Sequence, residues 1–186
     1  FNLVGRHDKI TETVKAKDLW NELIQCAWEC ADPGIQFDGA IQKMHTCAAD
    51  GRINATNPCS EYVFLDDTSC NLASHNLLSY LTSDGKFLIE EFKYAVSIAT
   101  IAMDSFIDFS SFPTEEIKNG TRRYRTLGIG YSGLGAFLMC LGVPYASVTG
   151  RNMAASITSL MSAMGYLTSH AMAQVAGAFD AYKNNQ

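Results

Sequence analysis

The feature that most constrains this chain is a long stretch, residues 33–71, in which no hydrophobic periodicity is sustained. Turn-forming residues recur along it: Pro33, Gly34, Gly39, Gly51 and Pro58. One short strand, residues 62–65, is expected within it. Loops this long inside a compact domain usually carry function. We therefore expect regular elements arranged around one functional excursion.

The regular elements on both sides of this excursion are predicted to be helices, because apolar residues recur there at helical spacing. The predicted helices span residues 15–31, 72–81 and 90–109, a segment ending near residue 141, and 150–176. Hydrophobic residues make up 47% of the chain and charged residues 18%. This composition supplies a sizeable core and excludes intrinsic disorder.

Charge and hydropathy exclude several classes of function. The net charge is -5, whereas proteins that bind DNA through its phosphates usually carry a basic excess. No apolar run reaches the roughly 18 residues that a membrane span needs. The chain begins with Phe1 and carries no signal-peptide pattern, so we interpret it as an internal fragment of a cytoplasmic protein.

The cysteines separate into two groups by their surroundings. Six are too few for a disulfide scaffold in a chain of this length, and no CxxC pair suggests zinc. Cys26 and Cys30, four apart on a predicted helix, and Cys140, in an apolar run, are expected in the core. Cys59 and Cys70 differ, because their neighbours are polar and turn-forming.

The run Asn57-Pro58-Cys59-Ser60-Glu61 combines three chemically active side chains. Proline biases the preceding residue toward extended geometry, and alternate residues of an extended chain face the same side. Asn57, Cys59 and Glu61 would then present an amide, a thiol and a carboxylate in one row. Such groups can bind a hydroxyl, act as a nucleophile, reductant or hydrogen-atom donor, and accept a proton.

A second motif, Ser69-Cys70-Asn71-Leu72-Ala73-Ser74, follows this run. Together the two resemble the active-site finger loop of ribonucleotide reductases, in which Asn-Pro-Cys-(Gly/Ser)-Glu precedes Cys-Asn-Leu-(Ala/Gly)-Ser. Flanking segments also resemble the adenosylcobalamin-dependent, class II enzymes, at residues 28–37, 45–47, 51–54 and 62–67. Residues 125–130 and 141–145 are similar to the wider superfamily, so the resemblance covers nearly the whole chain.

The resemblance implies that residues 1–186 are part of one catalytic α/β domain. The chain would be a mostly helical fragment of a ten-stranded α/β barrel, with the finger loop threaded inside and shielded from solvent and oxygen. The implied activity is that of a ribonucleoside-diphosphate reductase, which makes 2′-deoxyribonucleotides as DNA precursors. Whether the substrate is a diphosphate or a triphosphate stays open.

The resemblance also implies a role for each site residue. Adenosylcobalamin would generate a thiyl radical on Cys59, which abstracts the 3′ hydrogen of the ribonucleotide. Glu61 would accept the 3′-hydroxyl proton, aided by partial desolvation, and Asn57 would bind the ribose hydroxyls. Cys70 would be one half of a redox-active disulfide whose partner lies outside this chain. No metal ligand is expected among the residues of the chain.

The partners implied by the family complete this hypothesis. A thioredoxin-like or glutaredoxin-like reductant would restore the dithiol, and an allosteric nucleotide would bind outside this fragment. The resemblance allows a homodimer and gives no reason to expect DNA or membrane binding.

Three alternatives remain open at this point. One is a class I large subunit, which Pro58 disfavours because class I enzymes tend to carry leucine there. Another is a Rossmann-type nicotinamide dehydrogenase, suggested by the GxGxxG pattern of residues 128–133. It requires a strand that ends just before Gly128 and a helix that begins there, and close helix packing is the preferred interpretation of these glycines. The third is a helical binding module without chemistry.

Two further groups of polar residues have less specific interpretations. His45 and Cys47 could suggest a metal pair, but no second pair supports one, so they are taken as loop residues, with proximity to the cobalamin left open. Arg122, Arg123 and Arg125 are expected to form a solvated basic face.

Overall fold

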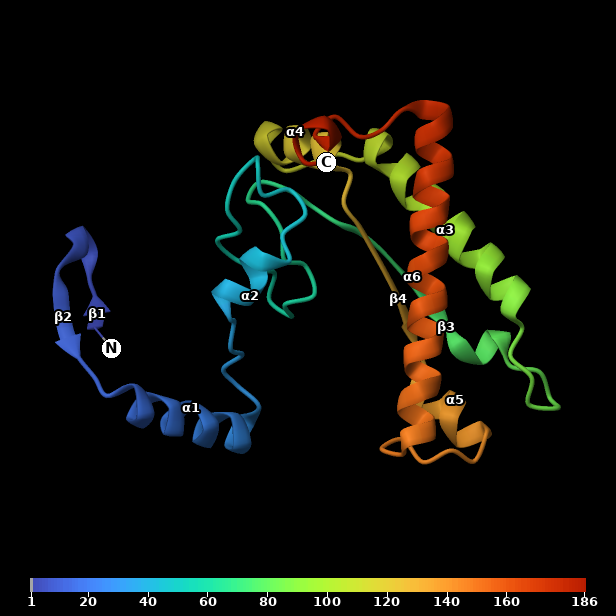
Figure 1. Cartoon of the computed structure of the whole chain (residues 1–186), viewed down its shortest axis with the longest axis horizontal. Helices are drawn as coiled ribbons and strands as arrows, with labels where there is room; N and C mark the ends of the chain where they lie inside the picture. The colour runs from blue at the N-terminus through green and yellow to red at the C-terminus, as the bar shows by residue number, and fades with distance from the viewer. Residues whose placement is uncertain (1) are drawn as a thin grey trace. The chain divides into compact units, whose positions relative to one another are not determined.

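The computed structural model describes residues 2–186 and divides them into two compact units, one running to Met44 and the other spanning His45–Gln186. Phe1 lies outside the described residues. Figure 1 labels the elements of both units. That residues 1–186 belong to one catalytic domain stays a prediction.

The first unit contains a hairpin and two helices. Strands β1 (Asn2–Val4) and β2 (Ile10–Thr13) pair antiparallel. Helix α1 (Ala16–Cys30) confirms the expected helix, and it is followed by the short helix α2 (Asp38–Lys43), which sequence reasoning assigned to a loop. Nothing in α1 is buried, so the expectation that Cys26 and Cys30 are core neighbours is wrong: Cys26 is half-buried and Cys30 is exposed.

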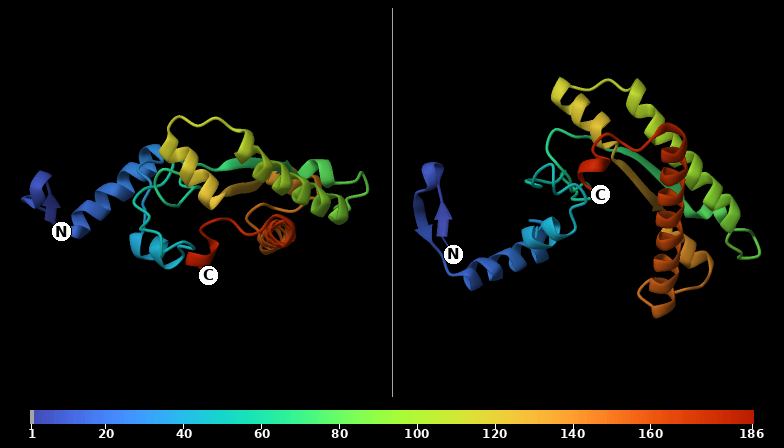
Figure 2. Two further views of the ribbon diagram at one scale, coloured as in Figure 1. Left: turned by 90° about the horizontal axis from the view of Figure 1, so that it is seen from above. Right: turned by 45° about the horizontal axis from the view of Figure 1, so that its top comes forward.

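The second unit is built on two parallel strands, β3 (Asn71–Asn76) and β4 (Leu127–Ser132). The chain between them forms the 3-10 turn η2 (Leu77–Tyr80) and helices α3 (Ile89–Phe109) and α4 (Glu115–Tyr124). After β4 come α5 (Leu134–Cys140), α6 (Val148–Ala176) and the 3-10 turn η3 (Tyr182–Asn184). Figure 2 shows the two strands running side by side, with the helices of this unit around them.

The core of the second unit lies where α3, α5 and α6 meet the strands. Its buried side chains are Leu77, Phe92, Val96, Phe137, Leu138, Ile157 and Met161. Burying each large apolar side chain of this kind contributes about 1.5–3 kcal/mol. The predicted helices over 90–109 and 150–176 are confirmed, since their apolar faces supply much of this core.

Strand β3 presents two different faces, as the alternation of side chains requires. Asn71 donates through Nδ2 to the Met103 carbonyl of α3 at 2.7 Å, and the His75 ring packs edge-on against Phe92 of the same helix. Leu72 and its alternate neighbours Ser74 and Asn76 are exposed. The sheet is therefore covered by α3 on one face.

Several sequence predictions of secondary structure are wrong. Residues 72–81 form β3 and η2 rather than a helix, because pairing with β4 decides the conformation of a short apolar run. Residues 62–65 form no strand, and the glycines of 128–133 lie in and just after β4 rather than in a packed helix. Cys140 is exposed at the end of α5 instead of buried.

Helix α4 was not expected, because its sequence is polar throughout. It is stabilised at its ends: the Thr114 hydroxyl accepts a hydrogen bond from the Ile117 N–H at 3.2 Å. Acidic residues occupy its first turn and arginines its last, as the helix dipole favours.

The fold class agrees with the expectation only in its coarser form. Residues 2–186 combine helices with strands, including one parallel β-α-β connection, and no closed barrel forms among them.

Candidate active site

The run from Asn57 to Tyr62 forms a tight turn rather than an extended row. The Ser60 N–H donates to the Asn57 carbonyl at 3.0 Å, and the Asn57 N–H donates to the Tyr62 carbonyl at 3.2 Å. Ser60 has φ 63°, in the left-handed region. The expected extended geometry is wrong, because a turn with one left-handed residue reverses the chain here. This conformation also explains why glycine can replace serine in the motif.

The turn places its three candidate side chains in different surroundings. The Asn57 side chain is half-buried, and its Oδ1 accepts a hydrogen bond from the Tyr62 N–H at 3.0 Å. Cys59 lies at the tip of the turn and is exposed, as is Glu61. Neither the expected shielding of the Cys59 sulfur nor the desolvation of Glu61 is provided by residues 2–186.

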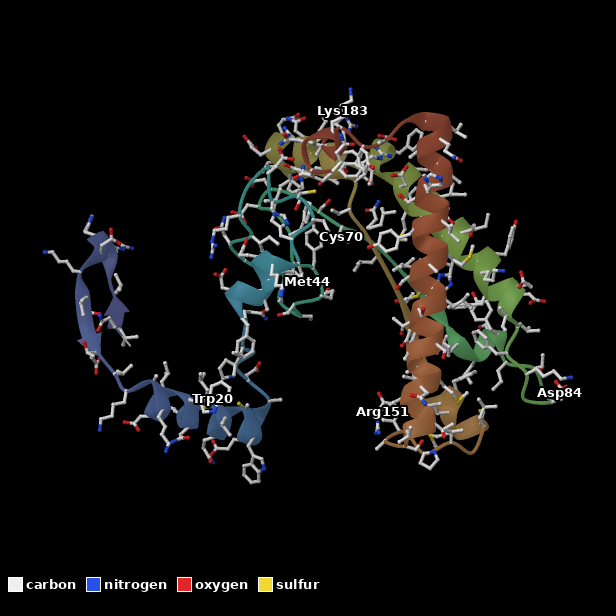
Figure 3. All side chains as sticks on the ribbon, in the orientation of Figure 1. Trp20, Met44, Cys70, Asp84, Arg151 and Lys183 are labelled. Atoms are coloured by element: carbon white, nitrogen blue, oxygen red, sulfur yellow. The ribbon has the colours of Figure 1, made fainter. Side chains whose placement is uncertain are left out.

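Cys70 lies directly before β3 and is half-buried (Figure 3). Burial, the larger cause, and the negative charge of Glu61 together raise the pKa of its thiol to about 11. Of the four predicted site residues, Glu61 is thus the one whose charge influences the titration of the Cys70 thiol.

Gly128 of β4 makes room for this sulfur. It pairs with Leu72 in the parallel sheet, and a Cβ built on it would lie 3.0 Å from Cys70 Sγ and clash with the Leu72 side chain. The glycine therefore leaves space for two side chains, those of Cys70 and Leu72, and the close helix packing that the sequence suggested is wrong.

The Rossmann interpretation of the glycines is wrong because of where strand β4 ends and helix α5 begins. Strand β4 runs through Gly128 to Ser132, and α5 begins at Leu134, so the glycines are not the loop between a strand and a helix. A phosphate-binding turn would need them at the helix N-terminus.

Two threonines that sequence reasoning missed fix the chain just before Cys70. The Thr121 hydroxyl of α4 accepts a hydrogen bond from the Ser69 N–H at 2.9 Å, and the Thr126 hydroxyl donates to the Ser69 carbonyl at 2.7 Å. Both lie more than fifty positions along the chain from Ser69. Only knowledge of the β3–β4 pairing could have identified them.

The arginines expected on a solvated face take part in ion pairs. Arg125 makes a bidentate pair with Asp104, Nε to Oδ1 at 2.7 Å and Nη2 to Oδ2 at 3.0 Å, and a second pair with Asp108. Arg122 donates to the Asp108 carbonyl at 3.2 Å. These contacts attach the end of α4 to α3, so these two arginines hold the fold together.

The third arginine, Arg123, contacts Asp50 through Nη2 at 2.8 Å. The Asp50 side chain is only 7% exposed, and its oxygens also accept hydrogen bonds from Asn184 and Asn185. Hydrogen bonding by Asn185, followed by contributions from Asn184 and the charge of Arg123, lowers the pKa of Asp50. These contacts join Asp50, which precedes the Asn57–Tyr62 turn, to the end of α4 and to the C-terminal turn η3.

His45 and Cys47 make hydrogen bonds within the loop. The His45 Nδ1 accepts from the Cys47 N–H at 3.3 Å, and its Nε2 lies 3.1 Å from the Gly51 carbonyl. The Cys47 side chain is buried, and this burial raises the pKa of its thiol. No group of three potential metal-ligating side chains occurs among residues 2–186. Among the same residues, no helix combines the length and the hydropathy that a membrane span requires.

Comparisons with known proteins identify relatives of the whole chain. Residues 2–186 match the family described as the ribonucleotide reductase barrel domain. The chain is 49% identical over 190 residues to a vitamin B12-dependent ribonucleotide reductase of Streptomyces avermitilis, covering 100% of this chain and 20% of that protein. It is 50% identical to the enzyme of that name from Streptomyces clavuligerus, covering 95% and 19% respectively. The chain thus spans about a fifth of the length of these curated relatives.

A solved structure supports the fold independently. The class Id ribonucleotide reductase alpha subunit of Actinobacillus ureae matches with a TM-score of 0.72 and 22% identity, covering 90% of this chain and 33% of that one. At this identity the likeness concerns the fold alone.

Proposed function

The chain belongs to the family of ribonucleotide reductase barrel domains, and from that premise we propose that it carries the catalytic thiol loop of an adenosylcobalamin-dependent ribonucleotide reductase. The full-length enzyme would reduce ribonucleotides to 2′-deoxyribonucleotides. High identity over the whole chain to reductases named as vitamin B12-dependent supports this cofactor over a class I mechanism.

The observation that carries the proposal is that hydrogen bonds join the two cysteine motifs. Tyr62 closes the turn that carries Cys59 and Glu61, and its hydroxyl donates to Thr68, while Thr126 holds the Ser69 carbonyl directly before Cys70. An exposed sulfur with a neighbouring carboxylate and a second, half-buried sulfur are thereby held on one loop. A reductase that uses one thiol as a radical and another as an electron donor requires such a grouping.

The residues of this chain would act in a fixed order. The thiyl radical of Cys59 takes the 3′ hydrogen atom of the ribose, while Glu61 accepts the 3′-hydroxyl proton and Asn57 hydrogen-bonds the ribose hydroxyls. The C2′–O bond breaks and the 2′-hydroxyl leaves as water. Cys70 and its partner thiol supply two electrons and two protons in total, and they end as one disulfide. Cys59 finally returns a hydrogen atom to C3′, and Glu61 returns its proton to the 3′ oxygen.

The exposed position of Cys59 fits a bulky radical source. When adenosylcobalamin is bound, it supplies the radical that removes the hydrogen atom from the Cys59 thiol. The tip of the turn, rather than a buried strand, gives such a group access to the sulfur. The remaining four-fifths of the enzyme would then close over the loop and keep solvent and oxygen from the radical.

The raised pKa of Cys70 suits its proposed part. A thiol with a pKa of about 11 stays protonated at neutral pH, so it can deliver hydrogen together with electrons. Its disulfide partner, the phosphate site and the allosteric nucleotide site would lie outside this chain. A thioredoxin-like or glutaredoxin-like protein of the cytoplasm would reduce the disulfide.

An anaerobic assay of the full-length enzyme tests this proposal. Ribonucleoside diphosphates and triphosphates are supplied in separate reactions with a dithiol reductant, under two conditions: with adenosylcobalamin and no second subunit, or with a metal-containing second subunit and no adenosylcobalamin. Deoxyribonucleotide formation that depends on adenosylcobalamin is the expected result. Activity that instead requires a separate metal-containing subunit would identify a class I enzyme, and no reduction under either condition would refute the proposal.

A further inference from the structure

Tyr62, which directly follows Glu61, is joined to the Cys59 turn through its backbone. Its N–H donates to Asn57 Oδ1 at 3.0 Å, and its carbonyl accepts from the Asn57 N–H at 3.2 Å. These two hydrogen bonds close the turn. The position of Tyr62 is therefore coupled to the position of the Cys59 sulfur.

The side chain of Tyr62 reaches the segment that leads into Cys70. Its hydroxyl donates to Thr68 Oγ1 at 2.8 Å and lies 2.9 Å from Thr126 Oγ1. Thr126 in turn donates to the carbonyl of Ser69, the residue before Cys70. Because the Thr68 and Thr126 hydroxyls donate to the carbonyls of Leu65 and Ser69, the single Tyr62 proton serves both threonine oxygens. This hydroxyl thus bridges the segment that leads into Cys70 and the start of strand β4.

The radical chemistry of the proposed function makes this bridge consequential. One sugar must meet the radical sulfur at C3′ and the redox sulfur near C2′ in the same complex. A displacement of about 1 Å between reacting groups can cost on the order of 100-fold in rate. Cys59 lies on an exposed turn with a left-handed residue, so something must hold that turn in place relative to β3.

We propose that Tyr62 is a positioning residue for the reductase: its hydroxyl, bound to Thr68 and Thr126, holds the Cys59 turn at a fixed separation from Cys70. This inference rests on the proposed function. It assigns no contact with substrate to Tyr62, because its hydroxyl is already used within the loop. The tyrosine ring is half-buried and packs near Phe64, with the ring centroids 6.2 Å apart.

The Tyr62→Phe variant separates positioning from packing. It keeps the ring and removes only the bridge. The Thr68 hydroxyl still donates to the Leu65 carbonyl and the Thr126 hydroxyl to the Ser69 carbonyl, so neither is left without a partner. Removing a hydrogen bond destabilises a protein most when it leaves a buried polar group without a partner. Tyr62→Phe leaves no such group, so the melting temperature should change little.

In the full-length enzyme we expect Tyr62→Phe to lower kcat by about tenfold, with KM for the ribonucleotide changed less than twofold. Thr126→Val should lower kcat similarly, whereas Thr126→Ser, which keeps the hydroxyl, should retain the wild-type value. Combining Tyr62→Phe with Thr126→Val should cost less than the sum of the two single effects, because both remove the Tyr62–Thr126 contact, although each also removes one contact of its own. The matched control is Tyr94→Phe on α3, where the tyrosine is 70% exposed.

The possible outcomes are distinct. Wild-type kcat in Tyr62→Phe, fully additive losses in the double variant, or a loss confined to KM would each overturn the positioning role. If Tyr62→Phe and Thr126→Val both lose kcat and both lower the melting temperature by the same amount, Tyr62 would contribute to stability alone. That result would also overturn the positioning role. If the wild-type enzyme itself reduces no ribonucleotide, the proposed function fails instead, which distinguishes the two claims.

Discussion

The electrostatic link between Glu61 and Cys70 makes a quantitative prediction about thiol reactivity. The ordinary pKa of a cysteine is 9.0, and that of Cys70 is raised to about 11. At pH 8 a thiol with a pKa of 9.0 is about one-tenth thiolate, whereas one with a pKa of about 11 is about one-thousandth thiolate. Since only the thiolate is alkylated, Cys70 should react roughly 100-fold more slowly than an ordinary cysteine of equal access.

Replacing Glu61 by glutamine tests the cause of this shift. Burial is the larger cause and would persist, but the negative charge would be gone. The pKa of Cys70 should therefore fall toward 9.0 without reaching it, and alkylation at pH 8 should become faster. Glu91→Gln is the matched control, because Glu91 is exposed in the first turn of α3.

The assay is alkylation with iodoacetamide between pH 7 and 11, followed by peptide mass spectrometry of Cys70 in the full-length enzyme. Below the pKa of a thiol its alkylation rate rises about tenfold per pH unit, and above the pKa it levels off, so a Cys70 pKa of about 11 predicts a rate that still rises at pH 10. Limited access of the reagent scales the whole curve without changing where it levels off. A Cys70 pKa near 9, or one that Glu61→Gln leaves unchanged, would show that this carboxylate does not act on this sulfur.

Three further predictions address the residues around the site. Gly128→Ala should destabilise the fold by about 1–3 kcal/mol in denaturant unfolding, because the new Cβ would meet the side chains of Cys70 and Leu72. The control is Gly135→Ala in α5, which has open space around it and should be neutral or slightly stabilising. Equal effects of the two variants would contradict the packing around Gly128. His75 is buried, and this burial lowers its pKa from 6.5, so the unfolded chain binds more protons below that pH. Stability should therefore fall as the pH drops below about 6.5, less steeply in His75→Gln than in wild type, and parallel pH profiles would exclude His75 as the cause. Cys70→Ser should impair repeated turnover with a thioredoxin-like reductant, and unimpaired cycling would remove its redox role.

The sequence predicted those elements whose information is local. Helices α1, α3 and α6 carry their own apolar periodicity, and their positions were confirmed closely. Strands β3 and β4 were missed, because their partner strands lie far away in the sequence and their short apolar runs suit a helix equally well. Helix α4 was missed because its stability comes from its ends and from ion pairs rather than from an apolar face.

The candidate site also divides into features that the local sequence predicts and contacts that depend on distant parts of the chain. The sequence drew attention to the motif around Cys59 and to the separate Cys70 through their polar, turn-forming surroundings, and their roles were predicted from the resemblance to ribonucleotide reductases. Their geometry was not, because the left-handed conformation of Ser60 turns a run that Pro58 would otherwise extend. The contacts of Thr126 depend on the pairing of distant strands, which no local pattern in the sequence reveals.

The central claim is that the sulfur of Cys59 carries the radical that starts ribonucleotide reduction. The most direct test is Cys59→Ser in the full-length enzyme, with deoxyribonucleotide formation measured in the presence of adenosylcobalamin and circular dichroism used to verify the fold. The account predicts a folded protein with no detectable product, because a serine hydroxyl does not form the required radical. Deoxyribonucleotide formation by a folded Cys59→Ser enzyme would contradict it.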